Sequence, residues 1–178
     1  MRSVQSMRSA RGEGIPTLVH RKSDRPVVAV TANIHGDEST GVGVVQALDA
    51  WLPEHLRRGT VVLYPTLNPG GLSSRTRVTP EGDDLNRLFP GRQRGSVAER
   101  NAATIWRDLE RRKGELLVDL HADSARSIPY AIIDRALRRY RGAELGPALE
   151  RYAEATGLTV LREYPEEQYT RYALDRSL

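Results

Sequence analysis

The sequence predicts an α/β fold of three layers, α/β/α, in which helices cover both faces of a mostly parallel (mixed) central sheet. Two features support this prediction: short apolar runs recur along the chain, and amphipathic helical patterns separate them. At 178 residues the chain suits one domain with a substantial core. We expect that domain to span residues 16–178, and residues 1–15 to form a flexible N-terminal tail.

The first half of the chain predicts two buried strands and a helix. Residues 26–32 and 60–65 are continuous apolar runs, which are typical of strands buried on both faces. Between them, residues 39–52 carry an apolar stripe at helical spacing, and Pro53 is expected to end this helix. A helix between two such strands is the pattern of a parallel sheet.

The second half begins with a long segment, residues 67–95, that has no helical or strand period and is rich in Gly, Pro, Asp and Arg. A segment of this kind is usually functional or disordered. Ser96 with Glu99 forms a capping box, which predicts a helix running to about Arg112. A third buried strand is expected over residues 116–120 and a fourth strand over 129–133. A helix over residues 145–156 and a fifth strand over 158–161 follow.

Composition restricts the kinds of function. Cysteine is absent, which excludes a thiol nucleophile and a cysteine-based zinc site, so any metal must be bound by His, Asp or Glu. The net charge of +4 comes from arginine, which suits bidentate capture of carboxylates, so we expect a small anionic substrate. The arginines are spread along the chain and aromatic residues make up only 6%, so nucleic acid is not an expected partner.

The apolar runs also bear on location. None approaches the roughly 20 residues that are needed to span a bilayer, so no membrane partner is expected. Residues 1–14 have no apolar core after their basic residues, unlike a secretory signal. We therefore expect a cytoplasmic protein.

Two polar clusters follow predicted strands at the point where each strand ends. His35 and Glu38 come after the first strand, and His121 follows the third strand. Because His35 and Glu38 are three residues apart in a tight turn, their side chains can face the same ion. An isolated HxxE pair is more often a surface or capping pair, but ligands collect where parallel strands end. Two histidines and one carboxylate form the ligand set of many hydrolytic zinc sites, which leave a fourth position for water.

The long segment supplies a third cluster, in which Arg77 precedes the neighbouring pair Asn86 and Arg87. Such a loop can bind a substrate carboxylate by charge-assisted hydrogen bonds. It can equally present an arginine to an oxyanion that develops during the reaction. Without the other two clusters, the same residues would be typical of a solvated, arginine-rich loop.

Taken together, the clusters follow the motif order of the succinylglutamate desuccinylase/aspartoacylase family, within the zinc carboxypeptidase superfamily. The matching segments are IHGDE, NPGG, Arg77, DLNRLFPG and VDLH. The chain resembles this family from about Val27 to His121, with every motif in the expected order. The ordered set is much more specific than any one motif.

The resemblance implies a zinc-carboxypeptidase-like fold and a role for each matching residue. Arg77 would be the catalytic residue that polarises the carbonyl or holds the oxyanion, and Asn86 and Arg87 would bind the substrate carboxylate. Asp119 would have a structural or supporting role. One Zn²⁺ ion would be bound by His35, Glu38 and His121.

One part of the family pattern has no clear counterpart. The family places a general-base glutamate on a strand well after the last zinc ligand, and His121 stands 57 residues before the end of this sequence. Glu163, Glu166 and Glu167 lie in a stretch that is typical of a loop or a helix start. A general base contributes about a hundredfold to ten-thousandfold in rate. We therefore expect the chain to be C-terminally incomplete and to hydrolyse its substrate poorly.

The function predicted is that of a zinc-dependent amidohydrolase, a deacylase that cleaves an N-acyl amino acid or similar small carboxylate with zinc-activated water. A metallocarboxypeptidase acting on peptide C-termini is the first alternative, because Asn86 and Arg87 suit either substrate. The second alternative is a non-catalytic, metal-binding module that lacks the general base.

Overall fold

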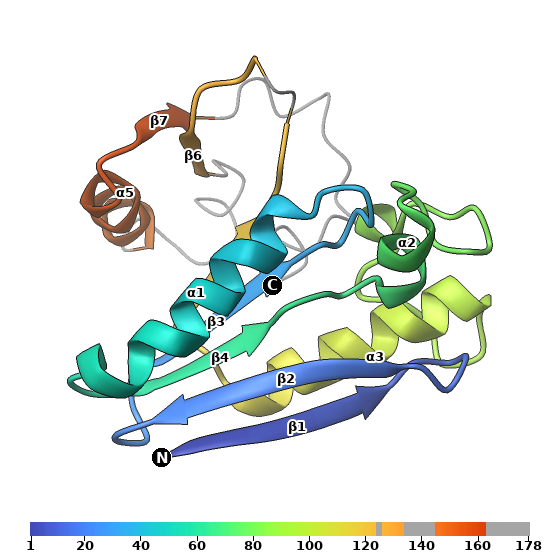
Figure 1. The fold of residues 1–178 in the computed structure, drawn as a ribbon, viewed down its shortest axis with the longest axis horizontal. Helices are drawn as coiled ribbons and strands as arrows, with labels where there is room; N and C mark the ends of the chain where they lie inside the picture. Colours follow the sequence, from blue (N-terminus) through green and yellow to red (C-terminus); the bar gives the residue numbers. More distant parts are fainter. Residues whose placement is uncertain (124–125, 134–144, 163–178) are drawn as a thin grey trace. The chain divides into compact units, whose positions relative to one another are not determined.

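The computed structural model describes residues 1–123, 126–133 and 145–162 (Figure 1). The chain divides into two units, Met1–Ala122 and Asp123–Leu178. This division differs from the single domain that was expected over residues 16–178. Its physical basis is strand pairing, because the strands described after residue 122 pair with each other in a separate sheet.

The first unit is built on a five-stranded sheet with the order β1-β2-β4-β3-β5. Its three parallel strands are β3 (Val27–Ala32), β4 (Thr60–Tyr64) and β5 (Leu116–Leu120), with β3 in the middle. β2 (Gly14–Arg21) joins β4 antiparallel, and β1 (Arg2–Arg8) forms the edge, antiparallel to β2. The predicted mixed sheet around parallel central strands is confirmed.

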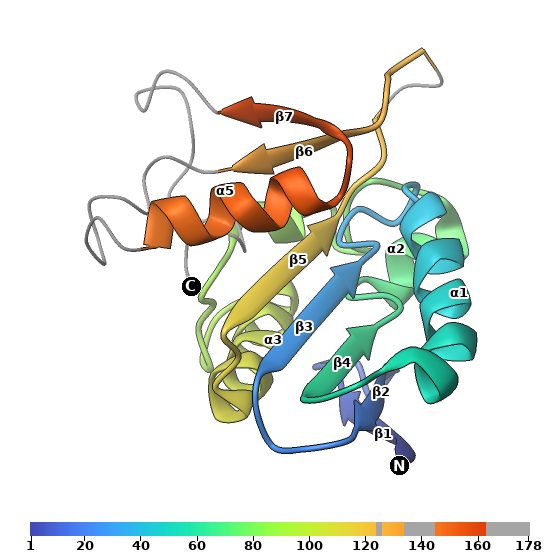
Figure 2. The ribbon, with the colours of Figure 1, turned by 90° about the vertical axis from the view of Figure 1, so that its left-hand side faces the viewer.

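Two long helices cover this sheet from opposite sides, α1 (Thr40–His55) on one face and α3 (Val97–Arg112) on the other (Figures 1 and 2). The three-layer arrangement is therefore confirmed. Burying a large apolar side chain contributes about 1.5–3 kcal/mol, so packing of α1 holds this layer in place. The core between α1 and the sheet contains five buried apolar residues, Val30, Ala32, Val45, Leu52 and Leu63.

The expected flexible tail over residues 1–15 is wrong. These residues form β1 and the start of β2, in a register that runs from Arg2 opposite His20 to Arg8 opposite Gly14. An edge strand receives its stability from the backbone ladder and needs few apolar side chains. β1 accordingly has mostly exposed side chains and carries no apolar run that would identify it from sequence.

Two further details differ from the sequence predictions. The segment 67–95 contains α2 (Pro69–Ser74) and the short 3₁₀ helix η1 (Leu85–Arg87), both too short to produce a periodic pattern. α1 passes Pro53 and ends at His55. The capping box that predicted the start of α3 is present as expected, with the Ser96 hydroxyl accepting from the N–H of Glu99.

The second unit contains β6 (Tyr130–Ile133), α5 (Leu145–Ala155) and β7 (Thr159–Arg162). β6 and β7 pair in parallel, so the helix between them completes a strand–helix–strand crossover. All three elements lie where the sequence predicted them. They form their own small sheet and do not extend the first one.

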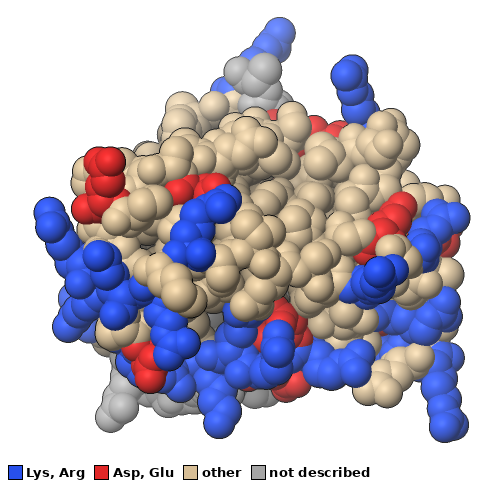
Figure 3. Space-filling model, turned by 60° about the horizontal axis from the view of Figure 1, so that its bottom comes forward, with Lys and Arg blue, Asp and Glu red and all other residues tan. Residues whose placement is uncertain are grey.

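Charged side chains are unevenly distributed over the face shown in Figure 3, where Lys and Arg prevail and acidic groups lie beside several of them. Ion pairs within the first unit include Arg2 with Asp49 (2.8 Å) and Arg25 with Glu115 (2.7 Å). Several arginines are thereby engaged in local pairing. Among the described helices, none combines the length and apolar character that crossing a membrane requires.

Candidate metal centre

The parallel strands bring the two predicted ligand clusters to one edge of the sheet. His35 and Glu38 lie in the loop between β3 and α1, and His121 directly follows β5. β3 and β5 are neighbours whose last residues, Ala32 and Leu120, stand opposite each other. The strand ends therefore place side chains that are more than 80 residues apart in sequence at one point.

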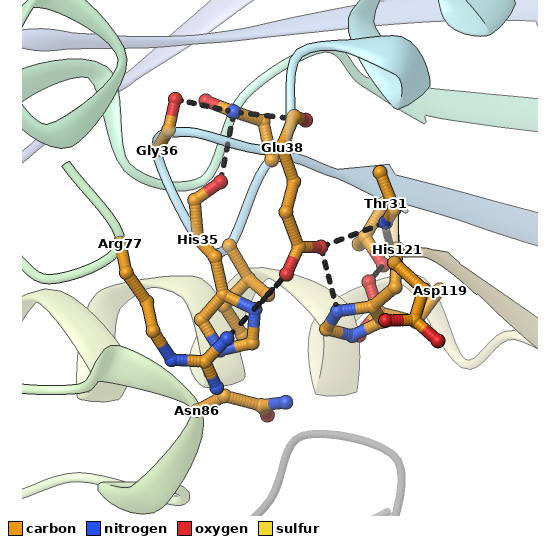
Figure 4. Close-up of polar contacts among 12 residues, drawn as sticks. Thr31, His35, Gly36, Glu38, Arg77, Asn86, Asp119 and His121 are labelled. Atoms are coloured by element: carbon orange, nitrogen blue, oxygen red, sulfur yellow. Dashed lines mark hydrogen bonds and ion pairs between the residues drawn. The ribbon is translucent and has the colours of Figure 1, made fainter. Parts of the chain in front are cut away.

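The carboxylate of Glu38 lies between the two imidazole rings (Figure 4). Its Oε1 is 2.7 Å from Nδ1 of His35, and its Oε2 is 3.0 Å from Nδ1 of His121. One ligand atom from each of the three residues lies within 4.8 Å of the others. The side chains of His35 and Glu38 are 4% and 11% exposed, whereas that of His121 is 38% exposed, so the cluster is accessible from the His121 side.

This donor set fits a zinc ion. Zinc binds imidazole nitrogen and carboxylate oxygen at about 2.0–2.2 Å, which in a tetrahedral site requires donor spacings of about 3.3 Å. The two Nδ1 atoms approach different oxygens of Glu38, and one donor atom from each residue lies within 4.8 Å of the others, so the side chains would adjust to bring three donors to one ion. Both rings already turn the same nitrogen, Nδ1, toward the shared carboxylate.

The remaining nitrogen of His35 supports the same assignment. Within the described residues, Nε2 of His35 is a buried atom without a hydrogen-bond partner. Oδ1 of Asp84 lies 3.3 Å from it, but outside hydrogen-bond geometry. A metal-binding histidine normally donates its other ring N–H to a carboxylate or carbonyl. Asp84 therefore lies where that acceptor is needed, a role that its place in the DLNRLFPG motif did not predict.

The outer nitrogen of His121 has such an acceptor. Its Nε2 is 2.9 Å from Oδ2 of Asp119, and the hydroxyl of Thr31 donates to Oδ1 of the same carboxylate at 2.6 Å. When Nε2 carries the proton and donates it to Asp119, Nδ1 is left with its lone pair facing Glu38 and the metal position. Thr31 had no assigned role either; a hydroxyl in an apolar strand is the signal that could have identified it.

The charged groups of the cluster stabilise one another. Burial disfavours ionisation of Glu38, but hydrogen bonds from His121, His35 and the N–H of Ala122 outweigh it and hold the pKa of Glu38 below its usual range. Burial also disfavours protonation of His121, yet bonding to Asp119 and Glu38 raises its pKa to about 10. The acidic and basic groups of the cluster therefore compensate each other's charge.

Of the three residues predicted to contact substrate, Arg77 joins the cluster. Its Nη1 is 3.5 Å from Oε1 of Glu38, and its Nη2 donates to Oδ2 of Asp84 at 3.2 Å. Asn86 is buried in the turn that Asp84 caps. Arg87 is exposed, and its Nη1 donates to the carbonyl of Asn86 at 2.8 Å. Arg77 and Asn86 appear with the metal ligands in Figure 4, whereas Arg87 bonds within its own turn.

Asp84 links these groups. One of its oxygens accepts from the N–H of Asn86 at 3.0 Å and faces His35, and the other accepts from Arg77. A single carboxylate thus joins His35, Arg77 and the turn of Asn86. The glutamates considered as general base, at positions 163, 166 and 167, lie outside the described residues.

The likeness to known proteins agrees with this geometry. The family model for the succinylglutamate desuccinylase/aspartoacylase catalytic domain matches residues 24–173. The N-alpha-acetyl-L-2,4-diaminobutyric acid deacetylase of Halomonas elongata is 32% identical over 136 residues, which cover 73% of this chain and 40% of that protein.

Solved structures show the same fold. An aspartoacylase family protein from Mesorhizobium loti superposes with a TM-score of 0.80 at 27% identity, over 98% of this chain and 56% of its own. A metallo-carboxypeptidase from Pseudomonas aeruginosa has a TM-score of 0.78 at 19% identity, over 97% of this chain and 51% of its own. The chain therefore spans about half the length of these relatives.

Proposed function

The chain belongs to the succinylglutamate desuccinylase/aspartoacylase catalytic-domain family, and from this premise we propose that it is a zinc-dependent deacylase acting on N-acyl amino acids. The observation that carries the proposal is the convergence of His35, Glu38 and His121 on one point at the carboxyl edge of the sheet. These residues would hold one Zn²⁺ ion. A zinc ion in such a site polarises the scissile carbonyl and activates water for attack on it.

The two imidazoles and the carboxylate have distinct tasks in this proposal. Glu38 would supply the single negative charge of the ligand set, and His35 and His121, binding the ion as neutral rings, would leave a net positive charge at the metal position. Asp119 holds the ring of His121 by its Nε2, so that the ring cannot rotate away from the ion. Asp84 lies where it can do the same for His35.

Arg77 would stabilise the negative charge that develops on the carbonyl oxygen. Its guanidinium lies beside Glu38 and is 47% exposed, so it is within reach of both the metal position and an entering substrate. The hydrogen bond that it donates to Asp84 holds it in place before substrate arrives, which is the property that makes an oxyanion-stabilising group effective.

Asn86 and Arg87 would bind the substrate's carboxylate. They extend from the turn that Asp84 caps, so the anion-binding pair is connected to the metal site through one side chain. A guanidinium and an amide together can make charge-assisted bonds to both oxygens of a carboxylate. The deacetylase from Halomonas elongata acts on an N-acetylated amino acid, which supports this class of substrate.

A metallocarboxypeptidase activity is the second candidate. Carboxypeptidase SOL1 of Arabidopsis thaliana is 31% identical over 94 residues, and a peptide C-terminus presents the same carboxylate to Asn86 and Arg87. The two activities differ in the group that lies on the other side of the scissile bond. Hydrolysis of N-acetyl and N-succinyl amino acids, with no release of residues from peptide C-termini, is the result expected for the deacylase.

Zinc content tests the metal site directly. The purified 178-residue chain is dialysed against zinc and then against metal-free buffer, and the retained metal is measured by atomic emission. We expect one zinc per wild-type chain and near-complete loss in His35→Ala and His121→Ala. His55→Ala is the matched control, because His55 is exposed at the end of α1, where its Nδ1 bonds to the carbonyl of Trp51 and its ring stacks on the ring of Trp51. Full zinc retention in both ligand variants would refute the site.

A further inference from the structure

Asn33, which directly follows the last residue of β3 and precedes the metal loop, is fully buried and has a positive φ of 56°. The left-handed region is unfavourable for most residues with a side chain, and asparagine is among those that tolerate it best. This backbone turn carries the chain out of β3 and into the loop of residues 34–38. The side chain of Asn33 is thereby directed back into that loop.

The amide of Asn33 binds the metal loop from the inside. Nδ2 lies 3.0, 3.1 and 3.2 Å from the carbonyl oxygens of His35, Gly36 and Glu38, and donates to all three. An amide nitrogen has two hydrogens, so one of them is shared between two acceptors. These carbonyls belong to the two proposed ligands of the loop, His35 and Glu38, and to Gly36.

The other end of the amide is fixed as well. Oδ1 accepts from the hydroxyl of Thr66 at 2.7 Å, and that hydroxyl in turn accepts from the N–H of Asn68 at 3.2 Å. The Asn68 N–H also lies 3.2 Å from the carbonyl of Asn33. Because only the NH₂ group can donate to carbonyls, these contacts allow one orientation of the amide. The loop is therefore held to the neighbouring turn by a closed set of buried hydrogen bonds.

We propose that Asn33 is a positioning residue of the metal site, an inference that rests on the proposed zinc-dependent function. It contacts neither the metal position nor the substrate position. It fixes the backbone of residues 35–38, so that His35 and Glu38 already point to the same place before the ion binds. Without it, the loop must be ordered at the expense of binding free energy, and zinc affinity falls.

The test compares Asn33→Gly with a matched substitution elsewhere in the first unit. Glycine accepts the positive φ without strain, so this variant removes the amide and leaves the backbone turn feasible. The control is Asn101→Gly, at a partly buried asparagine on α3 that accepts a bond from the N–H of Ala10. Glycine inside a helix also lowers stability, so the control separates a loss of stability from a loss of positioning.

Two readouts are used on the full chain: the zinc dissociation constant, from competition with a chromophoric chelator, and the visible absorption spectrum of the Co²⁺-substituted protein. We expect Asn33→Gly to bind zinc about tenfold to a hundredfold more weakly and to alter the Co²⁺ spectrum, while Asn101→Gly matches the wild type. Thr66→Val, which removes the partner of Oδ1 with little change in shape, should lie between them.

Wild-type zinc affinity and an unchanged Co²⁺ spectrum in Asn33→Gly would overturn the inference, as would an equal loss in Asn101→Gly. If Asn33→Gly does not fold, Thr66→Val decides, and unchanged zinc affinity there has the same meaning. A wild-type chain that binds no zinc would instead remove the proposed function itself. The two failures are therefore distinguishable.

Discussion

At the scale of single residues, the site depends on side chains that hold the ligands as much as on the ligands themselves. Asp119 is the clearest case, because it lies between the hydroxyl of Thr31 and the outer nitrogen of His121. If Nε2 donates its proton to Asp119, Nδ1 keeps the lone pair that the proposed metal would bind. A carboxylate in this position raises the basicity of the ligand and fixes its ring.

We therefore expect Asp119→Asn to weaken zinc binding about tenfold to a hundredfold, since the amide is a poorer acceptor for the ring N–H and holds it less firmly. The zinc dissociation constant, measured by chelator competition, checks this. Asp49→Asn is the matched control, because Asp49 pairs with His20 at 2.7 Å on the α1 side of the first unit. A wild-type dissociation constant for Asp119→Asn, or equal losses in both variants, would contradict the role given to Asp119.

At the scale of elements, α3 is tied to the sheet by a buried charge. Asp108 is 5% exposed and also pairs with Arg111. Its carboxylate accepts hydrogen bonds from the hydroxyl of Tyr64 on β4 and from Nε of Arg112, both at 2.8 Å. Burial opposes ionisation of this carboxyl, but the bonds from Arg112, Arg111 and Tyr64 prevail and lower its pKa. The guanidinium of Arg112 also lies over the ring of Tyr64.

Asp108→Asn should lower the free energy of unfolding by about 2–4 kcal/mol at neutral pH, because the buried Tyr64 and the partly buried Arg112 lose a charged acceptor. The pKa of Asp108 is depressed in the folded state, so its contribution is present above the unfolded-state pKa of about 4 and is lost as the pH falls through the folded-state value. Urea unfolding at pH 7 and at progressively lower pH measures this. A difference between wild type and variant that stays constant down to pH 2 would exclude the ionic role.

The helices and strands also show which parts of the fold can be predicted from sequence patterns. Apolar runs and the Ser96–Glu99 capping box predicted the parallel strands and α3, because these features are local and are read without knowledge of the rest of the fold. β1 could not be predicted in this way, since its order comes from the backbone ladder with β2 and its side chains are mostly exposed. The short helices α2 and η1 depend on single caps, Asn68 and Asp84, and not on periodicity.

At the scale of the whole molecule, the site arises from topology. The sequence predicted that His35, Glu38 and His121 would meet, because the ends of parallel strands share one edge, and the structure places their ligand atoms together. The same reasoning could not identify Asn33 or Thr31, whose roles depend on contacts at 2.6–3.2 Å across different segments. It also placed the later strands in one sheet, whereas β6 and β7 pair separately.

Anomalous scattering from a zinc-loaded crystal of this chain, recorded at the zinc absorption edge, locates the ion without reference to activity. We expect a single strong peak about 2.0–2.2 Å from Nδ1 of His35, Nδ1 of His121 and the Glu38 carboxylate. We further expect Nε2 of His121 still bonded to Asp119. A peak at another position, or coordination through Nε2 of either histidine, would contradict the account.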